Sequence, residues 1–273
     1  MTNWMTGICE TAEATLHYVR TGGAGPPLIL LHGLTGNGAC WRPLARVFES
    51  EFDLVMPDAR GHGRSSTPPS GYRYEDHCRD VVGLIRALGL QSPVLLGHSM
   101  GGMTATVVAG QLGDAVGGLI VADPTFLSPE RQREVYDSDA VEQHRRLLSQ
   151  SRDAQIADLR IRHPRRSLEM VELLAEARSQ TRLNAFDVLI PLNPDYRQLV
   201  GALRAPILLV IGDRPVVSIE TARELQSLNP RVQIEQIADA GHGLPYDQPE
   251  KLAAVVSCFL RSVAARRSRQ RAP

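Results

Sequence analysis

Ser99 stands in the stretch VLLGHSMGGM, residues 94–103, with Gly97 two positions before it and Gly101 two positions after it. The apolar run before this serine is typical of a strand, and the run after it favours a helix. The pattern G-x-S-x-G between a strand and a helix is typical of a tight turn that exposes a serine hydroxyl. That hydroxyl becomes a strong nucleophile only when a base removes its proton. The motif therefore predicts nucleophilic catalysis, with a simple tight turn as the alternative.

Strands and helices alternate along the chain around this serine. Short, continuously apolar runs predict strands that are buried on both faces of a mostly parallel sheet. They lie at residues 27–33, 52–58, 93–99, 118–124, 206–213 and 232–242. Residues 14–23 alternate between apolar and polar and, with the residues before them, predict an opening antiparallel hairpin. Helical periodicity follows at 74–89 and 249–263. The predicted fold class is α/β, a doubly wound, mostly parallel sheet of eight strands.

The pattern changes between residues 126 and 200, where strand signals vanish and charged, helix-favouring sequence takes over. An all-helical insert between two strands of such a sheet predicts a cap over the strand ends. The chain then divides into a core domain, 1–125 and 201–273, and a helical cap, 126–200. The insert contains twelve acidic residues and twelve arginines. We therefore interpret its arginines as solvated helix faces with mixed ion pairs rather than as an anion site.

Composition excludes several classes of function. The 273 residues have a formal net charge of zero, which gives no electrostatic basis for binding nucleic acid or an anionic membrane. No apolar run approaches the roughly 20 residues that span a bilayer, and no secretory signal is visible at the start. The cysteines show no C-x-x-C spacing and the histidines no H-E-x-x-H pattern. We expect a cytoplasmic protein that needs no metal or other cofactor. Its oligomeric state is not predicted.

Four motifs together resemble the α/β-hydrolase fold family over nearly the whole chain. They are LLHGLTG at 30–36, DARGHGRS at 58–65, GHSMGG at 97–102 and AGHGLPYDQPE at 240–250. Their order and spacing are specific for the fold and much less specific for a substrate. Because the family's dehalogenases and epoxide hydrolases use a carboxylate nucleophile, a serine at this position disfavours both activities.

The resemblance implies a role for each residue that matches a motif. Ser99 would be the nucleophile, and His242, in a glycine-flanked loop after the last strand, its general base. The backbone N–H groups of Met100 and Leu34 would stabilise the oxyanion, with Gly33 as the other candidate donor. The remaining histidines within motifs are interpreted as packing or loop-bracing residues. They are His32, His62 and His98.

The carboxylate that orients the histidine is the unusual feature of this sequence. The family commonly has the pattern G-D-x-D-x-V-V after the strand at 206–213, with the second aspartate as the acid. Here the sequence is GDRPVVS, which retains Asp213 and lacks that second aspartate. Some members, including the zearalenone-lactonase group, place the acid after the preceding strand, where this chain has Asp123. We favour Asp123 as the acid and keep Asp213 as the alternative. A turn or helix-capping residue is the non-catalytic interpretation of Asp123.

The predicted function is that of a serine hydrolase that cleaves a small, apolar carboxylic ester or lactone through an acyl-enzyme. The alternatives are a hydrolase of C–C bonds in β-diketones or ring-cleavage products, and a non-catalytic ligand receptor that retains the fold. We expect a mostly apolar pocket under the cap. The candidate substrate contacts, each with ordinary packing as its alternative, are Trp41, Phe126, Leu127, Tyr136, Met170, Phe186 and Leu192.

Overall fold

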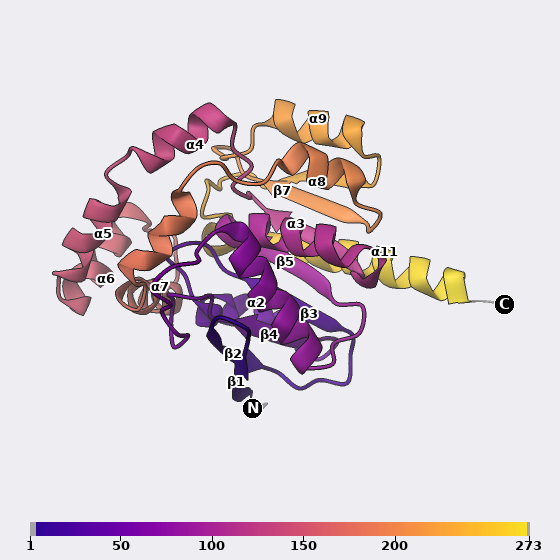
Figure 1. Ribbon diagram of the computed structural model, residues 1–273, viewed down its shortest axis with the longest axis horizontal. Helices are drawn as coiled ribbons and strands as arrows, with labels where there is room; N and C mark the ends of the chain where they lie inside the picture. The colour runs from indigo at the N-terminus through magenta and orange to yellow at the C-terminus, as the bar shows by residue number, and fades with distance from the viewer. Residues whose placement is uncertain (1–3, 272–273) are drawn as a thin grey trace.

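The computed structural model describes residues 4–271, which form one eight-stranded sheet with helices on both faces (Figure 1). The strand order is β1-β2-β4-β3-β5-β6-β7-β8. The strands are β1 (Met5–Glu10), β2 (Thr15–Arg20), β3 (Pro27–Leu31), β4 (Asp53–Pro57), β5 (Val94–His98), β6 (Gly118–Ala122), β7 (Ile207–Ile211) and β8 (Val232–Gln236). β2 pairs antiparallel with β1 and β4, and all other neighbours are parallel. The mostly parallel, eight-stranded sheet expected from the sequence is therefore present.

Helices connect the parallel strands, and two more helices follow the last strand. They are α1 (Arg42–Phe48), α2 (Tyr74–Ala87), α3 (Met100–Leu112), α4 (Pro129–Tyr136), α5 (Ala140–Leu148), α6 (Arg152–Arg162), α7 (Leu168–Ser179), α8 (Tyr196–Ala202), α9 (Ile219–Leu228), α10 (Leu244–Asp247) and α11 (Pro249–Arg271). Short 3-10 helices lie at Gly38–Trp41, Gly113–Ala115 and Leu183–Leu189. Within residues 4–271, no helix combines the length and the apolarity that crossing a bilayer requires.

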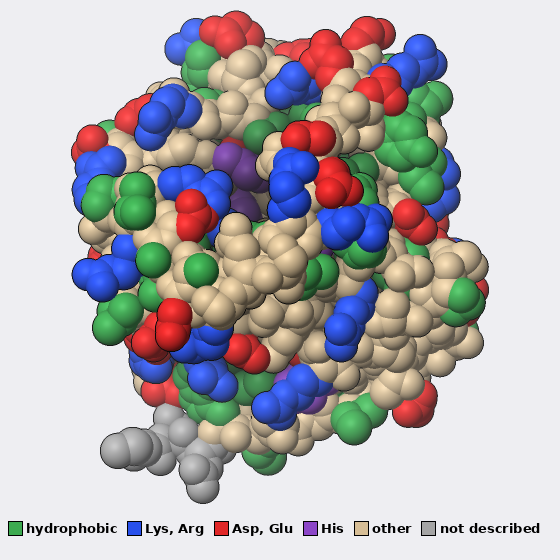
Figure 2. All heavy atoms as spheres, turned by 90° about the vertical axis from the view of Figure 1, so that its left-hand side faces the viewer, with side chains coloured by type: hydrophobic (Ala, Val, Ile, Leu, Met, Phe, Trp, Pro, Cys, Tyr) green, Lys and Arg blue, Asp and Glu red, His purple; other side chains and the backbone are tan. Residues whose placement is uncertain are grey.

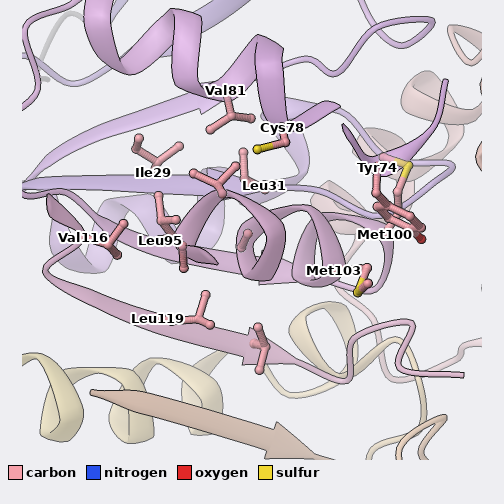
Figure 3. Packing of buried hydrophobic residues seen from close by; sticks show 14 of the residues in the cluster. Ile29, Leu31, Tyr74, Cys78, Val81, Leu95, Met100, Met103, Val116 and Leu119 are labelled. Carbon is pink, nitrogen blue, oxygen red and sulfur yellow. The ribbon is translucent and has the colours of Figure 1, made fainter. Parts of the chain in front are cut away.

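Two apolar cores, one on each face of the sheet, hold the strands in place. Successive residues of β3 alternate between them because side chains in a strand point to opposite faces. Ile29 and Leu31 pack toward α2 and α3, as Figure 3 shows, whereas Leu28 and Leu30 pack toward α1 and α11. Burial on both faces explains why the parallel strands are continuously apolar in sequence. The ends of these strands are thereby fixed rigidly enough to position a site.

The helices α4 to α7 lie to one side of the sheet, between β6 and β7 in the chain (Figure 1). These helices and the residues that lead into and connect them are called the cap from here on. They contain a small core of their own, in which Met170 and Leu174 of α7 are buried with Leu159 of α6. Cys40 and Tyr246 of the body join this cluster and so anchor it to the sheet. Helix α8 contacts α3 and α9 instead, although most of it falls in the range predicted for the cap.

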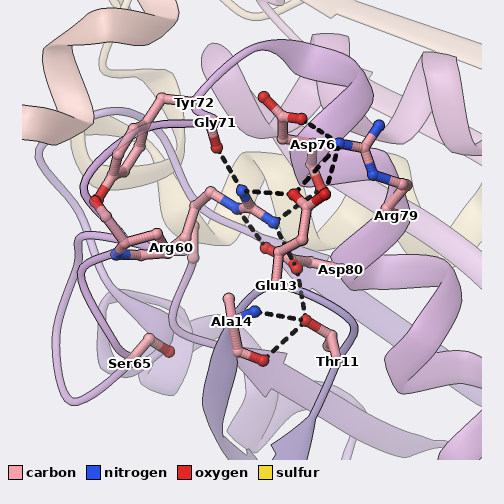
Figure 4. Close-up of polar contacts among 12 residues, drawn as sticks. Thr11, Glu13, Ala14, Arg60, Ser65, Gly71, Tyr72, Asp76, Arg79 and Asp80 are labelled. Carbon is pink, nitrogen blue, oxygen red and sulfur yellow. Dashed lines mark hydrogen bonds and ion pairs between the residues drawn. The ribbon is translucent and has the colours of Figure 1, made fainter.

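A buried arginine ties the loop after β4 to α2 (Figure 4). The side chain of Arg60 is completely inaccessible, and its Nε and Nη2 donate to the two carboxylate oxygens of Asp80 at 2.6 and 2.8 Å. Asp80 also accepts a hydrogen bond from the Thr11 hydroxyl, which adds the turn between β1 and β2 to the network. If either Arg60 or Asp80 were lost, the other charge would stay buried without a partner and would strongly destabilise the fold. The pair therefore fixes the position of the loop relative to α2. The loop that carries Arg60 passes close to the site described next.

Candidate active site

Ser99 occupies a sharp turn between β5 and α3, with φ 53° and ψ −120°. Positive φ is unfavourable for a residue with a side chain, so the surrounding structure must enforce this conformation. A Cβ atom on Gly97 would lie 2.1 Å from the carbonyl oxygen of Gly101, and one on Gly101 would lie 2.2 Å from that of Leu31. Only glycine fits at either position. The two glycines therefore permit the turn that presents the Ser99 hydroxyl at the N-terminus of α3.

The imidazole of His242 lies between a hydroxyl and a carboxylate. Its Nε2 is 2.9 Å from Oγ of Ser99, and its Nδ1 is 2.7 Å from Oδ2 of Asp123. Because an ionised carboxylate can only accept, Nδ1 carries the proton and Nε2 is free to accept the serine proton. Nε2 of His98 contacts the carbonyl oxygen of His242 at 2.7 Å, which fixes the backbone of this loop. The three side chains therefore have the geometry of an activated serine nucleophile.

Asp123 follows β6 and is completely buried, with a φ of 41°. Its carboxylate accepts hydrogen bonds from the backbone N–H groups of Val216, at 2.9 Å to each oxygen, and Val217, at 3.0 Å. These donors belong to the loop after β7, the segment that lacks the family's usual second aspartate. The loop therefore supplies N–H groups that hold a carboxylate arriving from the neighbouring strand.

Asp213 has a different partner. Its Oδ2 accepts a hydrogen bond of 2.6 Å from the backbone N–H of Asp239, in the turn that precedes His242. No hydrogen bond joins Asp213 to His242 in the described part of the chain. The structure therefore brings Asp123, and not Asp213, to the histidine, and it places Asp213 where it braces the histidine loop.

The loop after β3 lies directly beside the serine turn, because a Cβ atom on Gly33 would be 3.2 Å from Cβ of Ser99. Gly33, Leu34 and Met100 line the same cavity as Ser99, and no intramolecular acceptor within residues 4–271 takes the N–H of Leu34 or Met100. Nε2 of His32 accepts from the N–H of Ala59, so its Nδ1 donates to the carbonyl oxygen of Gly33. Held in this way, the loop leaves the N–H of Leu34 unengaged beside the Ser99 hydroxyl. The assignment of Leu34 and Met100 to an oxyanion hole stays a prediction.

Histidines that brace these loops are neutral at physiological pH. Burial lowers the pKa of both His62 and His98 to about 3. His62 contacts the carbonyl oxygens of Leu34 and Arg60, and His98 contacts that of His242. A neutral imidazole has a single N–H, so His98 donates from Nε2 to His242, whereas His62 can donate to only one of its two carbonyl partners.

Acidification is expected to weaken the fold well before the carboxylates titrate. An unfolded histidine binds a proton near pH 6.5, whereas His62 and His98 in the folded chain do so only near pH 3. Stability is therefore lost as the pH falls below 6.5, at up to about 1.4 kcal/mol per pH unit for each histidine. Urea unfolding at pH 7.5, 6.0 and 5.0 measures this slope. A His62→Asn variant should show a shallower acid dependence, and an unchanged slope would contradict the prediction.

A cavity of about 640 Å³ lies between the carboxyl ends of the strands and the cap. The body contributes Ser99 and His242, and the cap contributes apolar side chains such as Leu127 and Leu174 together with three arginines. Figure 2 shows the cap face, where histidine side chains are visible in a hollow with basic side chains at its border. Within the described residues, no group of three or more His, Cys, Asp or Glu side chains is placed to hold a metal ion.

The sequence model of the family described as "alpha/beta hydrolase fold" matches residues 26–249. This chain belongs to the α/β-hydrolase fold family. The N-formylmaleamate deformylase of Pseudomonas putida is 32% identical over 256 residues, which are 89% of this chain and 92% of that protein. The 2-(acetamidomethylene)succinate hydrolase of Mesorhizobium japonicum is 27% identical over 89% of this chain and 90% of its own.

Solved structures agree with this assignment. The crystal structure of an E-2-(acetamidomethylene)succinate hydrolase superposes with a TM-score of 0.81 at 25% identity and covers 95% of this chain and 100% of its own. A thermophilic esterase of Thermogutta terrifontis, solved with malate bound, has a TM-score of 0.77 at 26% identity, with coverages of 95% and 99%. These matches do not single out the zearalenone-lactonase group, so that narrower resemblance stays a prediction.

Of the seven predicted substrate contacts of this α/β-hydrolase, Leu127 lines the cavity and six do not. For these six residues the prediction is wrong, because each side chain packs elsewhere or faces solvent. Trp41 lies in the core beneath the sheet, Phe126 stacks on Tyr196, and Met170 is buried inside the cap. Phe186 packs on His144 and lines a second cavity, whereas Tyr136 and Leu192 are half exposed.

The cavity wall instead contains residues that the sequence analysis did not single out. Arg131, Arg166 and Arg178 of the cap line it, with His163 beside them. The interpretation of the cap arginines as solvated faces with mixed ion pairs is therefore wrong for Arg166 and Arg178. Both side chains turn inward in a segment whose acidic and basic residues are equal in number. The cavity is mostly apolar, as expected, and the arginines form a cationic part of its wall.

Proposed function

We propose that this α/β-hydrolase cleaves a carboxylic ester or lactone through an acyl-enzyme on Ser99. The observation that carries the proposal is the continuous hydrogen-bonded chain from the Ser99 hydroxyl through His242 to the buried carboxylate of Asp123. A receptor that only binds its ligand has no use for a strained serine turn with a base in hydrogen-bond contact. The adjacent cavity gives a substrate access to the hydroxyl.

The reaction proceeds in two halves. Ser99 Oγ attacks the carbonyl carbon while Nε2 of His242 takes the hydroxyl proton, and Asp123 stabilises the imidazolium that forms. The N–H groups of Met100 and Leu34 stabilise the oxyanion. Nε2–H then protonates the departing alkoxide, which leaves as an alcohol or, from a lactone, stays attached to the acyl group. In the second half His242 deprotonates a water molecule, which attacks the acyl-enzyme and releases the acid and the Ser99 hydroxyl.

An N-acyl compound is a second candidate substrate. Two relatives that match about nine-tenths of this chain are named for the hydrolysis of N-formylmaleamate and 2-(acetamidomethylene)succinate. The same residues support this reaction, because Nε2–H of His242 would protonate a departing nitrogen in place of an oxygen. The difference from ester cleavage lies in the leaving group alone.

Labelling with a fluorophosphonate tests the nucleophile without assuming a substrate. The proposal predicts one covalent adduct per chain, located on Ser99 by peptide mass spectrometry, and no adduct in Ser99→Ala. Initial rates with 4-nitrophenyl esters, lactones, N-formyl amides and a vinylogous β-diketone then separate the reaction classes. Absence of labelling in the folded wild-type protein would contradict the proposal, and cleavage of the diketone alone would replace it with a C–C hydrolase.

A further inference from the structure

The cap places an excess of positive charge in the wall of the active-site cavity. Three arginines, Arg131, Arg166 and Arg178, line the cavity, and no aspartate or glutamate within residues 4–271 lines it with them. Two of the three have carboxylate partners outside the wall. Arg131 pairs with Glu134 on the solvent side of α4 at 2.6 Å, and Arg166 pairs with Asp247 at 2.8 Å.

Arg178 of α7 has no such partner. In the part of the chain that the structure describes, its guanidinium forms no hydrogen bond and no ion pair. Burial, followed by the nearby cations Arg162 and Arg166, lowers the pKa of Arg178 to about 10, so the side chain still carries its charge at pH 7. A partly buried cation without a counter-ion is unfavourable in the empty protein and becomes favourable when an anion enters.

Arg166 brings the cationic wall close to the reacting groups. Its side chain is only 5% exposed and lies over the ring of Tyr246. A Cβ atom on Gly243, the residue after His242, would come within 2.5 Å of Nη2 of Arg166. The glycine at this position therefore allows the guanidinium to lie directly against the histidine loop. An anion held between Arg166 and Arg178 would be a neighbour of the bond that Ser99 attacks.

Among the histidines that line the cavity, His163 comes from the cap, and it does not supply the charge. Burial, followed by the nearby Arg166, lowers its pKa below the ordinary value, so its imidazole is neutral at pH 7. Arginine also matches a carboxylate better than any other side chain, because its planar fork donates two parallel hydrogen bonds. The geometry therefore favours a carboxylate as the anion and Arg178 as its main partner.

We propose that Arg178, with Arg166 beside it, binds a carboxylate group of the substrate while Ser99 attacks a second carbonyl of the same molecule. The inference rests on the proposed function and adds the substrate class: an ester, lactone or N-acyl compound that also carries a free carboxylate. Arg178 and Arg166 are specificity-determining residues in this account, and the proton transfers belong to His242.

Matched pairs of substrates test the proposal. One pair is the 4-nitrophenyl monoester of adipic acid and its methyl ester, which differ in charge on the acyl side. The other is 3-carboxy-4-nitrophenyl acetate and its methyl ester, which differ on the leaving-group side. We expect the wild-type protein to prefer the anionic member of at least one pair by tenfold or more in kcat/KM. Equal rates for the charged and neutral members of both pairs would overturn the proposal.

Variants of Arg178 test whether this side chain causes the preference for the anionic substrate. Arg178→Gln should lower kcat/KM for the preferred anion by about 10- to 100-fold, since a hydrogen-bonded charge contributes on the order of 1.5–3 kcal/mol. The loss should appear mainly in KM, and the neutral ester should change by less than twofold. Arg178→Lys should recover part of the loss. Arg145→Gln removes an exposed cap arginine outside the cavity and should leave both rates unchanged. A loss shared equally by the anionic and neutral esters would show a structural role and overturn the proposal.

Binding of adipate separates this inference from the proposed function. Adipate should inhibit cleavage of the neutral ester competitively in the wild-type protein, and it should raise the Tm of Ser99→Ala but not of Ser99→Ala with Arg178→Gln. If fluorophosphonate labels Ser99 and neither effect of adipate occurs, the carboxylate site is wrong and the serine hydrolase stands. If labelling fails and adipate still stabilises the protein through Arg178, the site stands and the proposed chemistry is wrong.

Discussion

Ser99→Ala is expected to lower kcat for any substrate of this α/β-hydrolase by about a million-fold, as loss of the nucleophile does in a serine protease with the same three catalytic groups. The hydroxyl lies 2.9 Å from Nε2 of His242, so its removal leaves the base nothing to activate except water. The residual rate would come from the oxyanion donors and from binding alone. Initial rates with a 4-nitrophenyl ester, corrected for the uncatalysed reaction, measure the loss.

The fold should survive this substitution, because alanine is compatible with the packing around a side chain that reaches into a cavity. The Tm of Ser99→Ala should therefore lie close to that of the wild-type protein. Ser227→Ala, which removes an exposed hydroxyl on α9, is the matched control and should retain full activity. Retention of more than 1% of wild-type kcat by a folded Ser99→Ala protein would contradict the assignment of the nucleophile.

Asp123→Asn is expected to lower kcat by about 10,000-fold without moving the backbone. The amide oxygen of the asparagine can still accept from the N–H groups of Val216 and Val217, which leaves its NH2 group facing Nδ1 of His242. Nδ1 must then accept, so the proton moves to Nε2 and points at the Ser99 hydroxyl. The histidine can no longer take the serine proton, and the imidazolium loses its counter-charge.

Asp213→Asn is the control that decides between the two carboxylates. Asn can still accept the hydrogen bond from the N–H of Asp239, so the turn before His242 should hold and kcat should fall by no more than a few-fold. Both variants should have near-UV circular dichroism spectra like that of the wild-type protein. Normal turnover in Asp123→Asn together with a collapse in Asp213→Asn would reverse the assignment of the acid.

Local sequence predicted the serine turn and the sheet because both depend on short-range rules. Glycine is required on both sides of Ser99 because a Cβ atom there would clash with neighbouring backbone, and continuous apolar runs indicate strands buried on both faces. The preference for Asp123 came instead from the resemblance to family members whose acid follows the preceding strand, and the structure shows what holds it there. A shortened loop after β7 leaves backbone N–H groups without the side chain that would normally stand there, and the end of the adjacent strand supplies a carboxylate to accept from them.

The wall of the cavity could not be predicted in this way. Which face of α7 turns inward depends on how α6 and α7 pack on each other and on Tyr246, and that contact joins residues far apart in the chain. Met170 is apolar and was expected at the substrate, yet it fills the interior of the cap. Arg178, two turns further along the same helix, faces the cavity although the charge balance of the segment suggested a solvated face.

Intact-protein mass spectrometry after rapid acid quench shows whether Ser99 carries the acyl group during turnover. With a 4-nitrophenyl ester in excess, we expect a burst of nitrophenol that does not exceed one per chain. The accompanying mass increase should equal the acyl group, map to the peptide that contains Ser99, and be absent in Ser99→Ala. Steady turnover by the wild-type protein with full activity retained in Ser99→Ala and no adduct on Ser99 would show that Ser99 is not the nucleophile.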